Sequence, residues 1–105
     1  MPFAPPPQLL AYYRAGKPLA CEIEQEPYLC EFWPMQELET WNAEYEVPAY
    51  APGFFGFATN GGGEMFALSP TGSVVYLPFI GMEPSLAREL APTWTDFEGS
   101  LRNAL

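Results

Sequence analysis

Glutamate is the residue type in this chain best placed to do chemistry, and its distribution is uneven. Ten glutamates and no lysine or arginine lie between Pro18 and Ala87, and eight of those glutamates fall between Glu22 and Glu46. The formal net charge is −9 over 105 residues, a negative potential that would repel nucleic acid and acidic membranes and attract a basic protein. The plain alternative is a solvated face that keeps the protein soluble.

Catalysis has little support among the residue types. The chain contains no histidine, which removes the commonest general base near neutral pH and every Ser-His-Asp arrangement. A pair of carboxylates such as Glu31 and Glu64 could serve a hydrolase. The abundance of glutamate is the one argument for such a pair, and we expect the protein not to be an enzyme.

The two cysteines, Cys21 and Cys30, offer no metal site or nucleophile of the usual kind. Two thiolates without histidine cannot complete a usual tetrahedral zinc site, and a cysteine nucleophile would lack its imidazole base. We expect both to be small buried hydrophobic residues that stay reduced. No metal and no cofactor are expected.

Length and segment composition indicate a single folded unit. A chain of 105 residues is expected to form one domain, residues 1–105, whose core needs no metal or disulfide. The N-terminal sequence MPFAPPPQ lacks the charged region and apolar core of a signal peptide. No apolar stretch reaches the ~18 residues that a membrane span requires. We therefore expect a cytoplasmic protein.

The elements that must position the glutamates are clearest in the middle of the chain. Two apolar runs within residues 54–69 are joined by Asn60 and three glycines, and Asn-Gly readily supplies the positive φ angles of a hairpin turn. A third run, residues 73–80, follows the turn residues 70–72. The pattern predicts a three-stranded antiparallel meander. Both faces of its strands are apolar, which is typical of central strands covered by helices.

The glycine triplet of this hairpin, residues 61–63, also resembles a phosphate-binding loop. Such a loop needs a strand-to-helix turn and a lysine, whereas Glu64 and another apolar run follow these glycines. We therefore interpret the triplet as a turn. Valine at any of the three glycines is expected to cost about 1 kcal/mol or more, because a β-branched residue adopts a positive φ only with strain.

Before the meander, the pattern predicts one helix and two strands. The helix begins near Pro7 and stops at Gly16. Residues 20–25 alternate in polarity as an edge or half-exposed strand does, and residues 28–33 form a second strand candidate. The inward side chains of the helix and the first strand are expected to be Leu9, Tyr12, Tyr13, Cys21 and Ile23.

Two further helices are predicted, one before and one after the meander in the sequence. Pro34 is suited to the first position of a helix that runs to about Tyr45. Thr93 and Asp96 approximate a capping box that starts a C-terminal helix. The apolar stripes are Leu38, Trp41 and Tyr45 in the first of these helices and Trp94, Phe97, Leu101 and Leu105 in the second.

The exposed glutamates of the first strand and the middle helix could form one acidic patch, with Trp33 or Tyr28 beside it as an aromatic anchor. Such a patch would bind a basic protein rapidly, and added salt would weaken the binding by screening the charges. The predicted partner-binding residues are Glu22, Glu24, Glu26, Glu31, Trp33, Glu37, Glu39, Glu44 and Glu46.

The order of these elements resembles the SUKH superfamily, which includes yeast cell-wall-assembly regulators and many bacterial immunity proteins. The resemblance runs from about Tyr28 to Leu101 and is carried by the segments FWPMQELETWN, GFFGFATN, GGGE, MFALSPTG, SVVYLPFIG and TWTDFEGSL. It implies an α+β fold, with a curved, mainly antiparallel sheet on which N-terminal, middle and C-terminal helices pack. It supplies no catalytic residues.

The resemblance also implies binding to another protein. Bacterial members of the superfamily resemble immunity proteins that neutralise toxins, often nucleases. Together with the acidic span, this predicts a module that blocks a basic toxin by direct binding. A regulatory or scaffold domain with a non-toxin protein partner is the alternative, and a carboxylate-dependent hydrolase is a remote one. Neither nucleic acid nor a membrane is expected as a partner.

Overall fold

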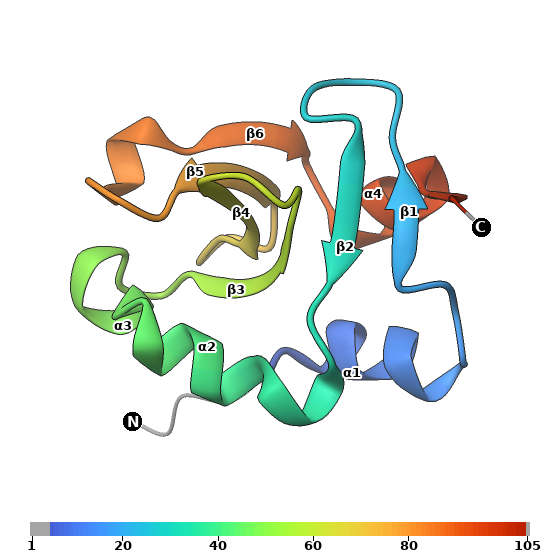
Figure 1. Ribbon diagram of the computed structural model, residues 1–105, viewed down its shortest axis with the longest axis horizontal. Coiled ribbons are helices and arrows are strands. Elements are labelled where there is room, and N and C mark those ends of the chain that lie inside the picture. Colours follow the sequence, from blue (N-terminus) through green and yellow to red (C-terminus); the bar gives the residue numbers. More distant parts are fainter. Residues whose placement is uncertain (1–4, 105) are drawn as a thin grey trace.

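The predicted meander forms the centre of the sheet (Figure 1). In the computed structural model, which describes residues 5–104, β3 (Phe55–Thr59), β4 (Glu64–Leu68) and β5 (Val74–Pro78) pair as consecutive antiparallel strands. Gly61, in the turn between β3 and β4, has a φ of +86°. The Asn-Gly hairpin and the three-stranded meander are therefore confirmed.

Four more strands extend the meander on both sides. Within the described residues, the seven strands form one antiparallel sheet in the order β6-β5-β4-β3-β2-β1-β7. The added strands are β6 (Arg88–Ala91) beside β5, then β2 (Leu29–Phe32), β1 (Ala20–Glu22) and β7 (Arg102–Asn103) beyond β3. The 3₁₀ turn η2 (Pro84–Leu86) precedes β6. The sheet curls like part of a barrel (Figure 1).

One face of the sheet is covered by α1 (Pro7–Arg14) and α4 (Trp94–Ser100). Phe97 of α4 is 1% exposed, and its ring centre lies 6.0 Å from the ring centres of both Phe57 and Phe66. Aromatic rings of α1 join the same core. The predicted role of the C-terminal helix as cover for the sheet is confirmed, and the fold is the expected α+β type.

The opposite face is covered by the middle of the chain. Here η1 (Met35–Glu37), α2 (Leu38–Glu44) and α3 (Val47–Tyr50) follow β2, and α2 and α3 pack against β3. The helix α2 lies close to β3, since a Cβ added at Gly56 would lie 3.4 Å from the side-chain oxygen of Asn42. Covered on both sides, the central strands are dry, as their apolar sequence predicted.

The predicted N-terminal helix and both strands are present, although β1 and β2 are shorter than the predicted runs 20–25 and 28–33. The helix α1 begins at Pro7 and buries Leu9 and Tyr12, and Gly16 beyond its end has a φ of +70°. The strand β1 keeps the predicted alternation of buried and exposed side chains. However, β1 does not form the edge of the sheet, because β7 pairs with it.

The C-terminal helix is shorter than its apolar stripe predicted. Thr93 caps α4 as expected, since its hydroxyl oxygen accepts a hydrogen bond from the Asp96 N–H at 3.1 Å. The helix ends at Ser100, and Leu101 has an extended backbone (φ −76°, ψ 139°) that leads the chain into β7. Leu101 still packs against the core. Leu105 lies outside the described residues.

The middle helix ends near Tyr45 as predicted, since α2 stops at Glu44, but it starts later than predicted because the 3₁₀ turn η1 comes first. Pro34 does not occupy the first helical position; it is extended (φ −57°, ψ 142°) and precedes η1. The helix α2 then begins at Leu38. Glu46 adopts a left-handed conformation (φ 55°) that separates α2 from α3.

Candidate functional site

Four of the predicted binding residues, Glu37, Glu39, Glu44 and Glu46, lie together on residues 35–50, which we name the acidic segment. All four side chains are exposed, and the segment contains no lysine or arginine. Its helices are only three to seven residues long, too short to be stable alone. Packing against the sheet must therefore hold these carboxylates in place.

Asn42 fixes the acidic segment to the sheet. Its amide nitrogen donates to the carbonyls of Leu38 and Gly56, each at 2.8 Å, and its carbonyl oxygen accepts from the Gly56 N–H at 2.7 Å. The pairing of β2 with β3 ends at Ala58, so Asn42 replaces a neighbouring strand at Gly56. Sequence reasoning missed this residue. Its one signal was a polar amide four residues after Leu38, on the inner side of the helix.

An aromatic cluster of Trp33, Trp41, Tyr45 and Phe79 lies against the acidic segment. The Tyr45 and Phe79 rings stack with centres 4.0 Å apart, and Tyr45 also stacks on Trp41 at 5.8 Å. Trp33, only 8% exposed, stacks beneath Tyr45 and Phe79 at 6.2 and 6.3 Å. The other three rings are partly exposed. Trp33 is thus the base of this cluster.

Within the acidic segment, a hydrogen bond links one ring of the aromatic cluster to a carboxylate. The indole N–H of Trp41 donates to the Glu37 carboxylate at 3.0 Å. Partly exposed Trp and Tyr rings beside carboxylates provide contact area and charge on the same surface. The arrangement fits a protein-binding surface better than a site for bond breaking.

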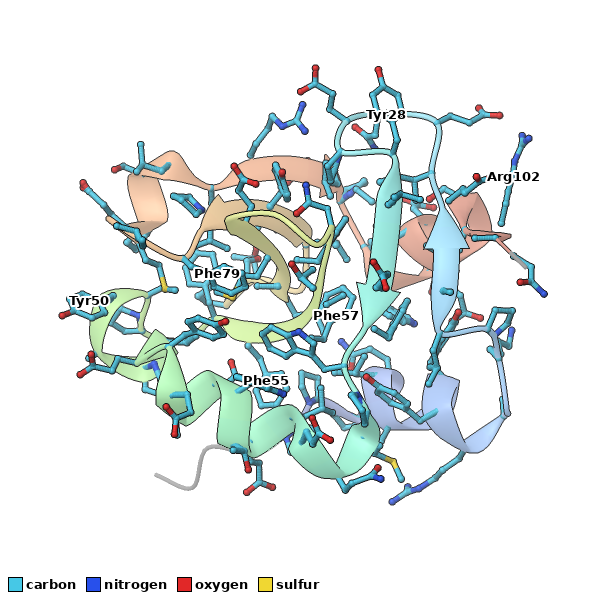
Figure 2. All side chains as sticks on the ribbon, in the orientation of Figure 1. Tyr28, Tyr50, Phe55, Phe57, Phe79 and Arg102 are labelled. Carbon is cyan, nitrogen blue, oxygen red and sulfur yellow. The ribbon has the colours of Figure 1, made fainter. Side chains whose placement is uncertain are left out.

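A hollow of about 450 Å³ opens beside the aromatic cluster, between α3 and the loop that follows β5. Ile80 in this loop is 92% exposed and Tyr50 at the end of α3 is 54% exposed. Figure 2 shows Tyr50 projecting outward from the molecule. The residues that line the hollow are Tyr50, Phe79, Ile80, Gly81, Met82 and Glu83.

The remaining predicted glutamates lie elsewhere. Glu22, Glu24 and Glu26 belong to the β1–β2 hairpin and its loop, at the opposite end of the molecule from α2 and α3 (Figure 1). Glu31 is exposed on β2, opposite Thr59 of β3. Four of the predicted glutamates therefore lie on the acidic segment, and three others lie on the β1–β2 hairpin and its loop.

Three of the four basic side chains, those of Lys17, Arg88 and Arg102, make contacts outside the acidic segment. Among the described residues, ion pairs join Lys17 to Glu98 and Arg102 to Glu24. The Arg88 guanidinium donates to the backbone carbonyl of Glu26. Within residues 5–104, neither ion pair includes a carboxylate of the acidic segment.

Comparison with known protein families identifies the fold family. The model of the SMI1 / KNR4 family (SUKH-1) matches residues 6–99. The chain belongs to this family. The match includes α1, so it reaches further toward the N-terminus than the resemblance carried by the sequence motifs. No curated protein matches the chain.

The two thiols of this SUKH-1 chain are buried, as predicted. Cys21 and Cys30 are direct partners in the β1–β2 ladder, and both thiols are free. Burial raises the pKa of both thiols, which disfavours the thiolate that a nucleophile or metal ligand needs. Within the described residues, no group of three or more His, Cys, Asp or Glu side chains is placed to hold a metal ion.

Glu64 of the SUKH-1 domain, named above with Glu31 as a hydrolytic pair, has a structural contact. Its carboxylate accepts a hydrogen bond from the Tyr76 hydroxyl at 3.0 Å, and that hydroxyl accepts from the Asn60 amide at 3.1 Å. Burial and the bond to Glu64 raise the pKa of Tyr76 to about 12. The hydroxyl therefore remains a donor that links β4, β5 and the hairpin turn.

None of the helices in residues 5–104 is long and apolar enough to span a membrane.

Proposed function

We propose that this SUKH-1 protein is a binding module that captures a basic protein through the acidic segment. One observation carries the proposal: four exposed glutamates lie beside partly exposed, stacked aromatic rings on a stretch without lysine or arginine. Carboxylates accelerate encounter with a positively charged surface. Trp and Tyr rings supply the contact area that retains a bound partner.

The partner class follows from charge and family together. We infer a toxin with a basic surface, such as a nuclease, which needs positive charge to bind its nucleic-acid substrate. An acidic module on that surface would neutralise the toxin by direct binding. The proposal locates this binding in the cytoplasm, where the thiols of Cys21 and Cys30 stay reduced. A regulatory or scaffold role with a non-toxin partner is the alternative, and the product of the adjacent gene distinguishes the two.

The test compares two triple charge reversals of equal size. The variant E37K/E39K/E44K reverses the acidic segment, whereas E22K/E26K/E89K reverses three exposed carboxylates at the hairpin end of the molecule. The partner is obtained by co-expression with the neighbouring gene product or by affinity capture from the native cell. The dissociation constant is then measured by calorimetry at low salt.

We expect E37K/E39K/E44K to bind at least about tenfold more weakly than wild type, because each lost charge pair weakens binding and each new lysine repels the partner. The hairpin triple should bind as wild type does. Both variants should keep the wild-type melting temperature, since exposed charges contribute little to stability. Equal weakening in both triples would indicate an effect of net charge alone, and wild-type binding by the first triple would refute the proposal.

A further inference from the structure

We propose that the hollow beside the aromatic cluster receives an arginine side chain of the basic partner. The inference rests on the proposed function and specifies how the partner is anchored. Charge complementarity supports it, because the lining of the hollow includes the carboxylate of Glu83 and no lysine or arginine. Glu83 lines the hollow and Glu46 immediately precedes α3, whose last residue is Tyr50.

The walls of the hollow match a cation carried on an apolar stem. Ile80 and Met82 are aliphatic, and the rings of Tyr50 and Phe79 add aromatic surface. Long basic side chains pack their methylene groups along such surfaces while their charged heads reach a polar partner. Aromatic faces also attract cations directly. The exposed carboxylate of Glu83 is the polar partner available in the lining.

Arginine fits this lining better than lysine does. Its guanidinium is planar, so it can stack on Tyr50 or Phe79 and present two N–H donors to one carboxylate. A lysine ammonium is more strongly hydrated and makes neither the stacked nor the two-pronged contact. The exposed Ile80 side chain (92%) would also lose solvent contact against the arginine stem, which favours binding.

Three capped tripeptides serve as probes: acetyl-Gly-X-Gly-amide, in which X is arginine, lysine or citrulline. Citrulline keeps the planar head of arginine but carries no charge. Each peptide is titrated into the ¹⁵N-labelled protein at low salt, and the backbone amide signals are followed by NMR. The protein variants are E83Q, Y50L, which retains apolar bulk without the ring, and E89Q as a matched control on β6.

We expect the arginine peptide to shift the amide signals of residues 79–83 in a saturable way. The lysine and citrulline peptides should bind about tenfold more weakly, the loss expected for one charge-assisted contact. E83Q and Y50L should weaken binding of the arginine peptide by a similar factor, and E89Q should leave its affinity unchanged. Unshifted signals at residues 79–83, equal binding of citrulline, or equal effects of E83Q and E89Q would overturn the proposal.

These outcomes are separate from those that test the proposed function. No partner protein takes part in the peptide titration, so its result does not depend on capture by the acidic segment. If the peptides fail while E37K/E39K/E44K still disrupts the partner complex, only the arginine anchor is wrong. If the arginine peptide binds at the hollow but the triple reversal leaves the partner complex intact, the acidic segment is not the capture surface.

Discussion

At the scale of single residues, Asn42 shows how one buried side chain positions an exposed surface. Its amide makes three hydrogen bonds, two of them to the backbone of Gly56, and it is completely buried. The acidic segment therefore depends on a polar group in the core. Loss of that group would leave a buried N–H and a buried carbonyl of β3 without a partner.

Replacement of Asn42 by leucine should lower the free energy of unfolding by about 2–4 kcal/mol, because two buried backbone groups lose their partners. Urea denaturation followed by circular dichroism measures this change. Thr40→Leu, at an exposed position of the same helix, is the control for added hydrophobicity and should stay within about 0.5 kcal/mol of wild type. Wild-type stability of Asn42→Leu would show that the amide does not hold the segment.

The structure corrects the expectation that valine is equally costly at all three hairpin glycines, because only Gly61 has a positive φ. Gly61 has a φ of +86°, but Gly62 and Gly63 have no positive φ, and a Cβ added at Gly63 would meet nothing within 4 Å. Gly61→Val should cost about 1–2 kcal/mol, whereas Gly63→Val should cost less than about 0.5 kcal/mol. Thermal melts of the two variants check this difference. Equal melting temperatures would mean that the turn does not require its left-handed residue.

Alkaline pH should destabilise the fold through the buried thiols. Burial raises the pKa of Cys21 and Cys30 above the ordinary value of 9.0, so the unfolded chain releases these protons before the folded chain does. The associated stability is complete below about pH 8 and is lost as the pH rises through 9 and beyond. Urea midpoints from pH 7 to 10 should fall less steeply in C21A/C30A. An equal slope would assign the loss to other groups.

At the scale of elements, the structure shows where local sequence rules are sufficient. The meander was predictable because its apolar runs and its turn residues both indicate the same strands and turns. The cap at Thr93 was predictable because a hydroxyl three residues before Asp96 is a local signal. By contrast, β7 spans only Arg102–Asn103 and forms because β1 offers it an open edge. No pattern within two residues can predict that pairing.

The 3₁₀ turn before α2 and the short helix α3 after it were also beyond local rules. The apolar spacing of residues 38–45 is that of one helix, and it predicted Leu38 as inward correctly. Glu46 ends the helix in a left-handed conformation that a glutamate rarely adopts. After that turn, α3 packs against β3. The sequence pattern does not predict this packing.

The closing helix α4 should be essential to the core. Phe97 is 1% exposed and lies between rings of β3 and β4, so Phe97→Ala should lower the free energy of unfolding by about 3–5 kcal/mol. Differential scanning calorimetry measures the shift. Removal of residues 92–105 should abolish cooperative melting, because both α4 and β7 are lost. A truncated chain that still melts cooperatively would show that α4 is an appendage.

At the scale of the whole molecule, the predicted binding glutamates are divided between two ends of the molecule. The acidic segment lies at one end, and the β1–β2 hairpin lies at the other (Figure 1). The glutamates were visible in the sequence, but their separation into two groups was not, since it depends on the curl of the sheet. The hollow at Tyr50 was equally hidden, because it forms between a helix and a loop that are 30 residues apart.

The most direct test of the central claim is the association rate constant of the protein with its basic partner, measured by stopped-flow mixing at increasing ionic strength. The account predicts a fast wild-type rate that falls steeply between about 0.01 and 0.15 M salt, where screening becomes effective over about 8 Å. E37K/E39K/E44K should start slower and show a flatter dependence, and E22K/E26K/E89K should follow wild type. A wild-type rate that ignores salt, or an unchanged steep dependence in the first triple variant, would contradict capture by the acidic segment.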